Sequence, residues 1–357
     1  MTWYAVRNPA SPVCCNNWRD ALRAGISLRV MQILFIGPSR IGDTVLASGV
    51  VNHLIATYPD ARFTVACGAA AAPLYEKVMP QLDRLITINK QPHGRHWWHL
   101  WKQVSCVRWS MVVDVRRSVI PWTVITDLRA VAPSSSRRDE HAVVSFARTL
   151  GLEDSPPSPG LWTNASHDAE AHKFIPPGPP VLAIGPTANW SGKIWSAQRF
   201  LETANRITAM EDNTSDAFLP GARIAVFGAA GERGIAQPVL DAIPGERLID
   251  LVGQIDLPTV TACMRRCAIY IGNDSGLMHM AAASGLPALG LFGPSRPKRY
   301  APWGLLTAWV KTQKSYEELI EVPNLNDPNI GSLMDSLSVD EVVAAASGLW
   351  RRTNKSM

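Results

Sequence analysis

The chain has 357 residues, of which 46% are hydrophobic and 18% charged, and its formal net charge is +5. This length exceeds one ordinary core and predicts two domains in a soluble globular protein. No apolar stretch approaches the ~20 residues that span a bilayer, and no dense Lys/Arg tract indicates a nucleic-acid partner. The mild positive charge fits an anionic ligand, and six cysteines without metal-type spacing fit a reducing cytoplasm.

The first thirty residues, 1–30, lack hydrophobic periodicity, so we expect a poorly ordered extension. Either Met31 is the natural start or the extension is a loosely attached tail. From Met31 onward, buried strands are predicted over 33–36, 63–67, 84–88 and 111–115, with a helix over 45–58. Such alternation favours a parallel, doubly wound sheet, which we assign to a first domain over residues 31–175.

The loop after the first strand, Gly-Pro-Ser-Arg-Ile-Gly-Asp-Thr over 37–44, has the spacing of a phosphate-binding P-loop with Asp43 in place of the lysine. A carboxylate would repel a phosphate, so we do not expect an ATPase loop, and the GxGxxG pattern of a dinucleotide enzyme is missing. Asp43 is suited to accept a proton from an incoming hydroxyl. The alternative is a first-turn charge that only stabilises the helix dipole.

Basic residues are expected near this loop. Arg40 lies beside Asp43, and Arg116 and Arg117 follow the strand over 111–115. Arginines there would hold carboxylates or phosphates of an acceptor, although surface charge is the simpler explanation for at least one of the pair Arg116 and Arg117.

Segment 93–102 combines indole rings with basic side chains; its tryptophans are Trp97, Trp98 and Trp101, which we place on one helical face. This composition suits a membrane interface, where indoles lie at headgroup depth. Packing of the tryptophans against the sheet is an equal alternative. Its three histidines have no acidic or Cys companions, so we expect no metal.

Proline-rich stretches at 153–160 and 176–180 mark a domain boundary. The α/β pattern then restarts, with strands predicted over 181–185, 223–228, 248–251, 269–271 and 288–292. We assign a second domain to residues 180–338 and a C-terminal helix and tail to 339–357.

The most informative motif, Ile-Gly-Asn-Asp-Ser-Gly-Leu-Met-His over 271–279, is predicted to be a strand, a turn and a helix start. Unpaired N–H groups and the helix dipole make such a terminus an anion site. The alternative is a plain helix cap. A ligand site is favoured, because a cap requires neither His279 nor the second turn at Gly293-Pro294, and open α/β sheets bind ligands beyond their strand ends.

Residues 272–294 resemble the donor-binding signature of glycosyltransferase family 9, the heptosyltransferases of lipopolysaccharide core synthesis. The resemblance extends over about residues 31–350 in four separated motifs. It implies an α/β, GT-B architecture, two Rossmann-like doubly wound domains facing across a cleft. It also implies a metal-independent, inverting transferase in the cytoplasm or on the inner face of the cytoplasmic membrane. Its donor would be a nucleotide-sugar, ADP-heptose, and its acceptor an anionic glycolipid such as the lipopolysaccharide core.

The resemblance also implies roles for single residues. Asp43 is the expected base, and Glu232 is the expected ribose ligand unless it is a simple first-turn glutamate. Lys193 would stabilise the leaving diphosphate, unless it is a solvated surface lysine. Thr187 and the N–H groups of Ser275, Gly276, Leu277 and Met278 would also hold this diphosphate, whereas Asp274 and His279 would fix the donor sugar or the loop.

Two other functions fit parts of this pattern. One is a transferase or epimerase that uses UDP- or GDP-sugars on the same fold. The other is a non-catalytic nucleotide- or glycan-binding protein. The joint presence of Asp43 and Lys193 argues against the second, because a pure binder needs no base.

Overall fold

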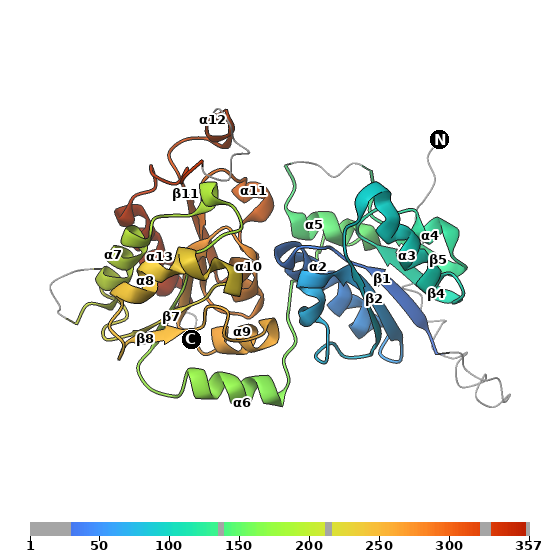
Figure 1. Ribbon diagram of the computed structural model, residues 1–357, viewed down its shortest axis with the longest axis horizontal. Helices are drawn as coiled ribbons and strands as arrows, with labels where there is room; N and C mark the ends of the chain where they lie inside the picture. The colour runs from blue at the N-terminus through green and yellow to red at the C-terminus, as the bar shows by residue number, and fades with distance from the viewer. Residues whose placement is uncertain (1–29, 135–138, 211–215, 322–329, 355–357) are drawn as a thin grey trace.

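The computed structural model describes residues 30–134, 139–210, 216–321 and 330–354. The expectation for residues 1–30 therefore lies outside the described residues, apart from Val30. Two α/β units, each with its own parallel sheet, lie side by side in Figure 1.

The first sheet has the order β3-β2-β1-β4-β5 and is parallel throughout. Its central strand is fully buried because the run Ile-Leu-Phe-Ile packs on both faces. The strands are β1 (Gln32–Ile36), β2 (Arg62–Gly68), β3 (Leu82–Ile88), β4 (Trp109–Asp114) and β5 (Thr126–Val131). The helices are α2 (Ile41–Thr57), η2 (Ala69–Leu74), η3 (Pro92–Gly94), α3 (Arg95–Val104), α4 (Ile120–Thr123), α5 (Ala142–Ala147) and η4 (Arg148–Leu150).

The second sheet has the order β11-β10-β9-β6-β7-β8 and is also parallel. Its strands are β6 (Val181–Gly185), β7 (Arg223–Val226), β8 (Leu248–Asp250), β9 (Ile269–Asn273), β10 (Ala288–Phe292) and β11 (Thr307–Lys311). Its helices are η5 (Ser191–Lys193), α7 (Ala197–Thr208), η6 (Ala230–Glu232), α8 (Arg233–Ala242), α9 (Leu257–Met264), α10 (Gly276–Ala283), α11 (Pro297–Tyr300), α12 (Tyr316–Ile320) and α13 (Val339–Asn354).

Both sheets reverse their strand order once, as Rossmann folds do. The reversal lies between β1 and β4 in the first sheet and between β6 and β9 in the second. Ligands bind beyond the carboxyl ends of strands at such switch points. The predicted doubly wound sheets are confirmed, and their topology places the loops after these four strands at the functional edges.

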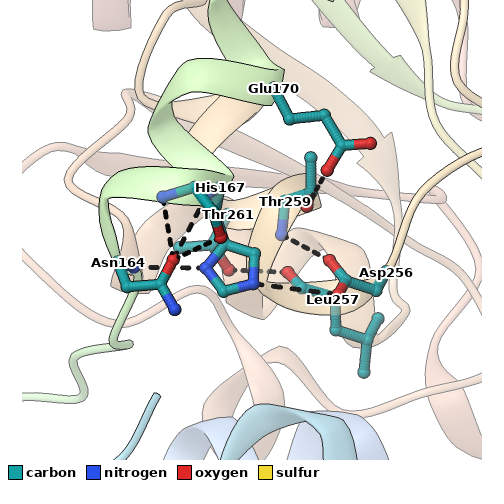
Figure 2. A network of polar contacts seen from close by, with 8 residues as sticks. Asn164, His167, Glu170, Asp256, Leu257, Thr259 and Thr261 are labelled. Carbon is teal, nitrogen blue, oxygen red and sulfur yellow. Dashed lines mark hydrogen bonds and ion pairs between the residues drawn. The ribbon is translucent and has the colours of Figure 1, made fainter. Parts of the chain in front are cut away.

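One helix from the end of the first predicted domain packs on the second sheet's layer. Helix α6 (Ala165–Phe174), within the range 31–175, contacts α9 through polar pairs that Figure 2 shows. The Thr259 hydroxyl donates to Glu170 at 3.1 Å, and the His167 ring lies 3.8 Å from the Asp256 carboxylate. Asn164 caps α6 by accepting two backbone N–H bonds. These contacts attach α6, which lies in the segment that connects the two sheets, to the second unit. The terminal helix α13 also packs on that unit, against α7 and β11.

Candidate active site

Two helix N-termini meet between the domains, from α2 of the first unit and α10 of the second. Helix α2 begins at residue 41, earlier than the expected 45, so Asp43 lies in its first turn. The two helices approach closely at a glycine on each side. A Cβ on Gly42 would lie 3.1 Å from Cδ2 of His279, and a Cβ on Gly276 would lie 3.0 Å from Cγ2 of Ile41. The loops from both switch points therefore border one site.

The carboxylate of Asp43 is half-buried and surrounded by charge. Burial raises its pKa above the usual value for aspartate, an effect that Arg40 and Arg299 oppose and Asp274 reinforces. A raised pKa makes a carboxylate a better proton acceptor, and the arginine charges favour its ionised form. Asp43 thus has the environment of a general base.

Across from it, Lys193 and Asp274 form an ion pair. The Lys193 Nζ donates to Oδ2 of Asp274 at 2.6 Å; the side chains are 23% and 7% exposed. An ammonium has three donors, so one bond to Asp274 leaves two for an anion. Lys193 is therefore held in place at the site, and the surface-lysine alternative is wrong.

The loop that bears Lys193 is locked to β9 by a buried asparagine. Asn273 accepts the backbone N–H of Trp195 at 3.1 Å and donates to the carbonyl of Pro186 at 2.9 Å. The Trp195 ring is buried and donates to the carbonyl of Leu337 at 3.0 Å. Sequence reasoning passed over Asn273, whose position next to Asp274 was its only signal.

The side chains of Thr187 and Glu232 are hydrogen-bonded to each other. The buried Thr187 hydroxyl donates to Oε2 of Glu232 at 2.7 Å, and the same oxygen accepts the backbone N–H of Ala229 at 3.0 Å. Glu232 therefore closes the turn before α8, as the first-turn alternative predicted. Both contacts engage Oε2 of Glu232, and a ribose role for this carboxylate stays a prediction.

The segment 274–279 forms the N-terminus of α10. Ser275 occupies the N-cap position but makes no side-chain cap bond within the described chain, unlike the capping serine expected of a plain helix start. Gly276 and Leu277 are half-buried, and Met278 packs in the core. Burial lowers the pKa of His279 to about 4, so its ring is neutral at pH 7.

A cavity of about 450 Å³ adjoins Lys193. Arg299 lines it and also acts on the charge of Asp43, which links the two sides of the site. The rest of its lining follows the turn after β10: Pro294, Ser295, Arg296 and Tyr300, with Tyr316 from α12. Sequence reasoning noted the Gly293-Pro294 turn but missed Arg299, whose signal was the basic run directly after that turn.

The three arginines expected on the acceptor side lie in three different environments. Arg40 is exposed, and its positive charge lowers the pKa of Asp43. The guanidinium of Arg116 lies 4.8 Å from the Trp97 ring centre and borders another cavity of about 440 Å³, together with Ser39 from the Asp43 loop. Arg117 is exposed, and its guanidinium donates to a carbonyl at 3.2 Å, outside this lining. The geometry therefore favours Arg40 and Arg116 over Arg117.

The tryptophans of α3 divide between packing and solvent. Trp97 and Trp101 pack against the core of the first unit, whereas Trp98 is 54% exposed and stacks on Trp101 at 4.7 Å. The prediction of one shared face is wrong, because Trp97 and Trp98 are adjacent and point about 100° apart on a helix. None of the described helices is both long and apolar enough to cross a bilayer. The described residues also contain no group of three His, Cys, Asp or Glu arranged to hold a metal ion.

Comparison with known proteins gives a consistent family. The model of glycosyltransferase family 9 (heptosyltransferase) matches residues 121–323. The lipopolysaccharide heptosyltransferase 2 of Salmonella typhimurium is 24% identical over 329 residues, covering 80% of this chain and 91% of that protein.

Solved structures share the fold. The glycosyl transferase family 9 structure from Veillonella parvula has a TM-score of 0.75 at 19% identity, covering 91% of this chain and 99% of the other. The E. coli ADP-heptose lps heptosyltransferase II has a TM-score of 0.69 at 19% identity, covering 91% and 100%. With more than half of its length matched by the family model, the chain belongs to glycosyltransferase family 9, the heptosyltransferases, and is a glycosyltransferase of GT-B fold.

Proposed function

We propose that this enzyme transfers a heptose from ADP-heptose to a lipopolysaccharide core or a related anionic glycolipid, with inversion at the anomeric carbon. The observation on which this rests is the juxtaposition of Asp43 in one domain with the Lys193–Asp274 pair and the α10 N-terminus in the other. The sugar, the nucleotide and the acceptor are those named for two similar proteins, the lipopolysaccharide heptosyltransferase 2 of Salmonella typhimurium and the E. coli ADP-heptose lps heptosyltransferase II.

The reaction needs one in-line displacement. The acceptor hydroxyl oxygen bonds to the anomeric carbon, its proton passes to Asp43, and the bond from that carbon to the diphosphate oxygen breaks. Charge that develops on the departing diphosphate is stabilised by the Lys193 ammonium and by the N–H groups at the start of α10. A single displacement inverts the configuration. No step in this scheme requires a cofactor or metal.

One of the proposed contacts needs a change of hydrogen-bond partner. Lys193 would keep its bond to Asp274 and use its free donors for the diphosphate. The Thr187 hydroxyl donates to Glu232 in this structure, so it would contact phosphate only by exchanging that acceptor. His279, neutral at pH 7, would act through hydrogen bonding rather than charge.

The nucleotide is tested by thermal shift. ADP, GDP, UDP and CDP are added separately to the full chain, and ADP should raise the Tm most, because a ligand that binds only the folded state stabilises it by mass action. Transfer from ADP-heptose to a lipopolysaccharide core is then followed by mass spectrometry. A larger shift with UDP or GDP would favour the transferase or epimerase alternative. Nucleotide binding without any turnover would favour the non-catalytic one.

We also propose peripheral contact with the inner face of the cytoplasmic membrane. Large apolar side chains are exposed on or beside α3, α4 and β5; they are Trp98, Val119, Trp122, Ile125 and Leu128, each at least 53% exposed. Cations lie over two of the indoles: Lys102 Nζ at 5.3 Å from the centre of Trp98, and Arg129 at 5.8 Å from that of Trp122. Indoles with basic neighbours suit an anionic bilayer interface.

Vesicle flotation tests this contact. Wild-type chain should float with vesicles rich in anionic lipid, and Trp98→Ser with Trp122→Ser should reduce the bound fraction. Trp309→Ser is the matched control, because Trp309 is 46% exposed in the other unit. Equal loss in the control, or none in the double variant, would refute the assignment.

A further inference from the structure

A second cavity, of about 320 Å³, adjoins the one beside Lys193. The two share Ser295, Arg296 and Tyr316 in their linings. The second cavity is completed by Lys298, Lys311 and Lys314, among others. Lys298 follows β10, Lys311 is the last residue of β11, and Lys314 follows β11. This is the edge at which open α/β sheets bind ligands.

The lining of this cavity is cationic. Four of its side chains are basic (Arg296, Lys298, Lys311 and Lys314), against the two carboxylates of Asp139 and Glu317. Within the described chain, the ion pair found here joins Arg296 to Glu317 at 3.3 Å. That pair is exposed and therefore weak. The three lysines are exposed and have no ion pair among the residues described, so their ammonium groups are available to an anion.

A buried hydroxyl also faces this region. Ser295 is 7% exposed, it borders both cavities, and its Oγ has no hydrogen-bond partner in the described part of the protein. A buried hydroxyl without a partner is unfavourable, so this position is suited to an oxygen-rich ligand. Ser295 thus provides an observation independent of the lysines.

We propose that this cavity binds a phosphate group of the acceptor glycolipid, in a subsite on the donor domain. This inference rests on the proposed function. A phosphate has up to two negative charges and several acceptor oxygens, which match three ammonium groups and a hydroxyl better than a single carboxylate does. Arg299, whose charge lowers the pKa of Asp43, lines the neighbouring cavity. Basic side chains therefore lie between the proposed base and this subsite.

The test uses the full chain with Lys311→Gln and Lys314→Gln combined. The matched control is Lys77→Gln with Lys173→Gln, two exposed lysines away from this lining that give the same change in net charge. Each protein is assayed at saturating donor with the phosphorylated acceptor and with the same acceptor dephosphorylated by hydrogen fluoride. Correct folding is checked by Tm, and Lys298→Gln serves as a second variant.

For the phosphorylated acceptor, the double variant should raise KM about tenfold, the loss expected for one charge-assisted contact. Its kcat and donor KM should change less than twofold. Wild-type KM should rise by a similar factor on dephosphorylation, and the variant should be insensitive to it, because both changes remove the same contact. An equal rise in KM for both acceptors, an equal effect in the control, or no effect in either variant would overturn the proposal.

Binding of inorganic pyrophosphate, measured by titration calorimetry, distinguishes a free anion from the acceptor. Pyrophosphate binding that is lost in the double variant, together with an acceptor KM indifferent to phosphorylation, would show a free-anion site and overturn the acceptor assignment. If wild type transfers no heptose, the proposed function fails. The subsite is then judged by equilibrium binding of the phosphorylated glycolipid, which should weaken about tenfold in the double variant if the proposal holds.

Discussion

Replacing Asp43 by asparagine tests the proposed base directly. Asparagine keeps the size and planarity of the side chain but does not accept a proton at neutral pH. In the structure, burial raises the pKa of Asp43 while Arg40 and Arg299 stabilise its charge. A positioned base contributes on the order of 100- to 10,000-fold. We therefore expect kcat to fall by that factor, about 3 to 5 kcal/mol of transition-state stabilisation.

Donor affinity should respond differently. Asp43 lies close enough to Lys193 and Asp274 to act on their charges. Removing a negative charge near a bound diphosphate cannot weaken attraction to it, so the Kd for ADP should stay constant or fall a few-fold. The wild-type kcat/KM should rise as pH increases through the raised pKa of Asp43, since the base acts when deprotonated. The variant should lack that step.

Steady-state transfer assays over a pH series measure the first effect, and calorimetry with ADP measures the second. Asp83→Asn is the control, because Asp83 forms an exposed ion pair with Arg62 on the first sheet. A kcat near the wild-type value, or a loss of rate that is matched by weaker ADP binding, would refute the base assignment. A pH step that persists in Asp43→Asn would do the same.

Three further changes test other parts of the site. Lys193→Ala should weaken ADP binding in calorimetry and lower kcat, because its charge acts in the ground state and more strongly in the transition state; unchanged values for both would limit Lys193 to positioning Asp274. His279→Gln should reduce the acid sensitivity of urea unfolding. With a folded pKa of about 4, the wild type should lose about 3 kcal/mol through this group as pH falls from about 6.5 to 4, where the unfolded state binds the proton and the folded state does not; an identical loss in the variant would contradict this. Gly185→Ala should lower the free energy of unfolding by about 1–3 kcal/mol, because its Cβ would clash with the buried Tyr270 hydroxyl. Adding Tyr270→Phe should restore part of that loss. An unchanged unfolding curve for Gly185→Ala would show that the Tyr270 ring moves aside without cost.

Local patterns in the sequence were enough for much of the architecture. Strand β1 and its neighbours were evident because parallel strands buried on both faces are short apolar runs. The strand, turn and helix start over 271–279 could also be predicted, because adjacent residues encode them. These features depend on near neighbours in the chain, so hydrophobic periodicity and glycine placement determined them.

Only the tertiary structure decided which residues meet. Lys193 and Asp274 are 81 positions apart, and no periodicity relates them. The same holds for Arg299 and Asp43, which come from different domains and share one electrostatic environment. Arg116 and Arg117 are equivalent in the sequence, but the loop after β4 places Arg116, and not Arg117, in the lining of the cavity that Ser39 also borders. Contacts between distant segments depend on how the two domains pack against each other at the site. That packing is determined by the whole chain and not by neighbouring residues.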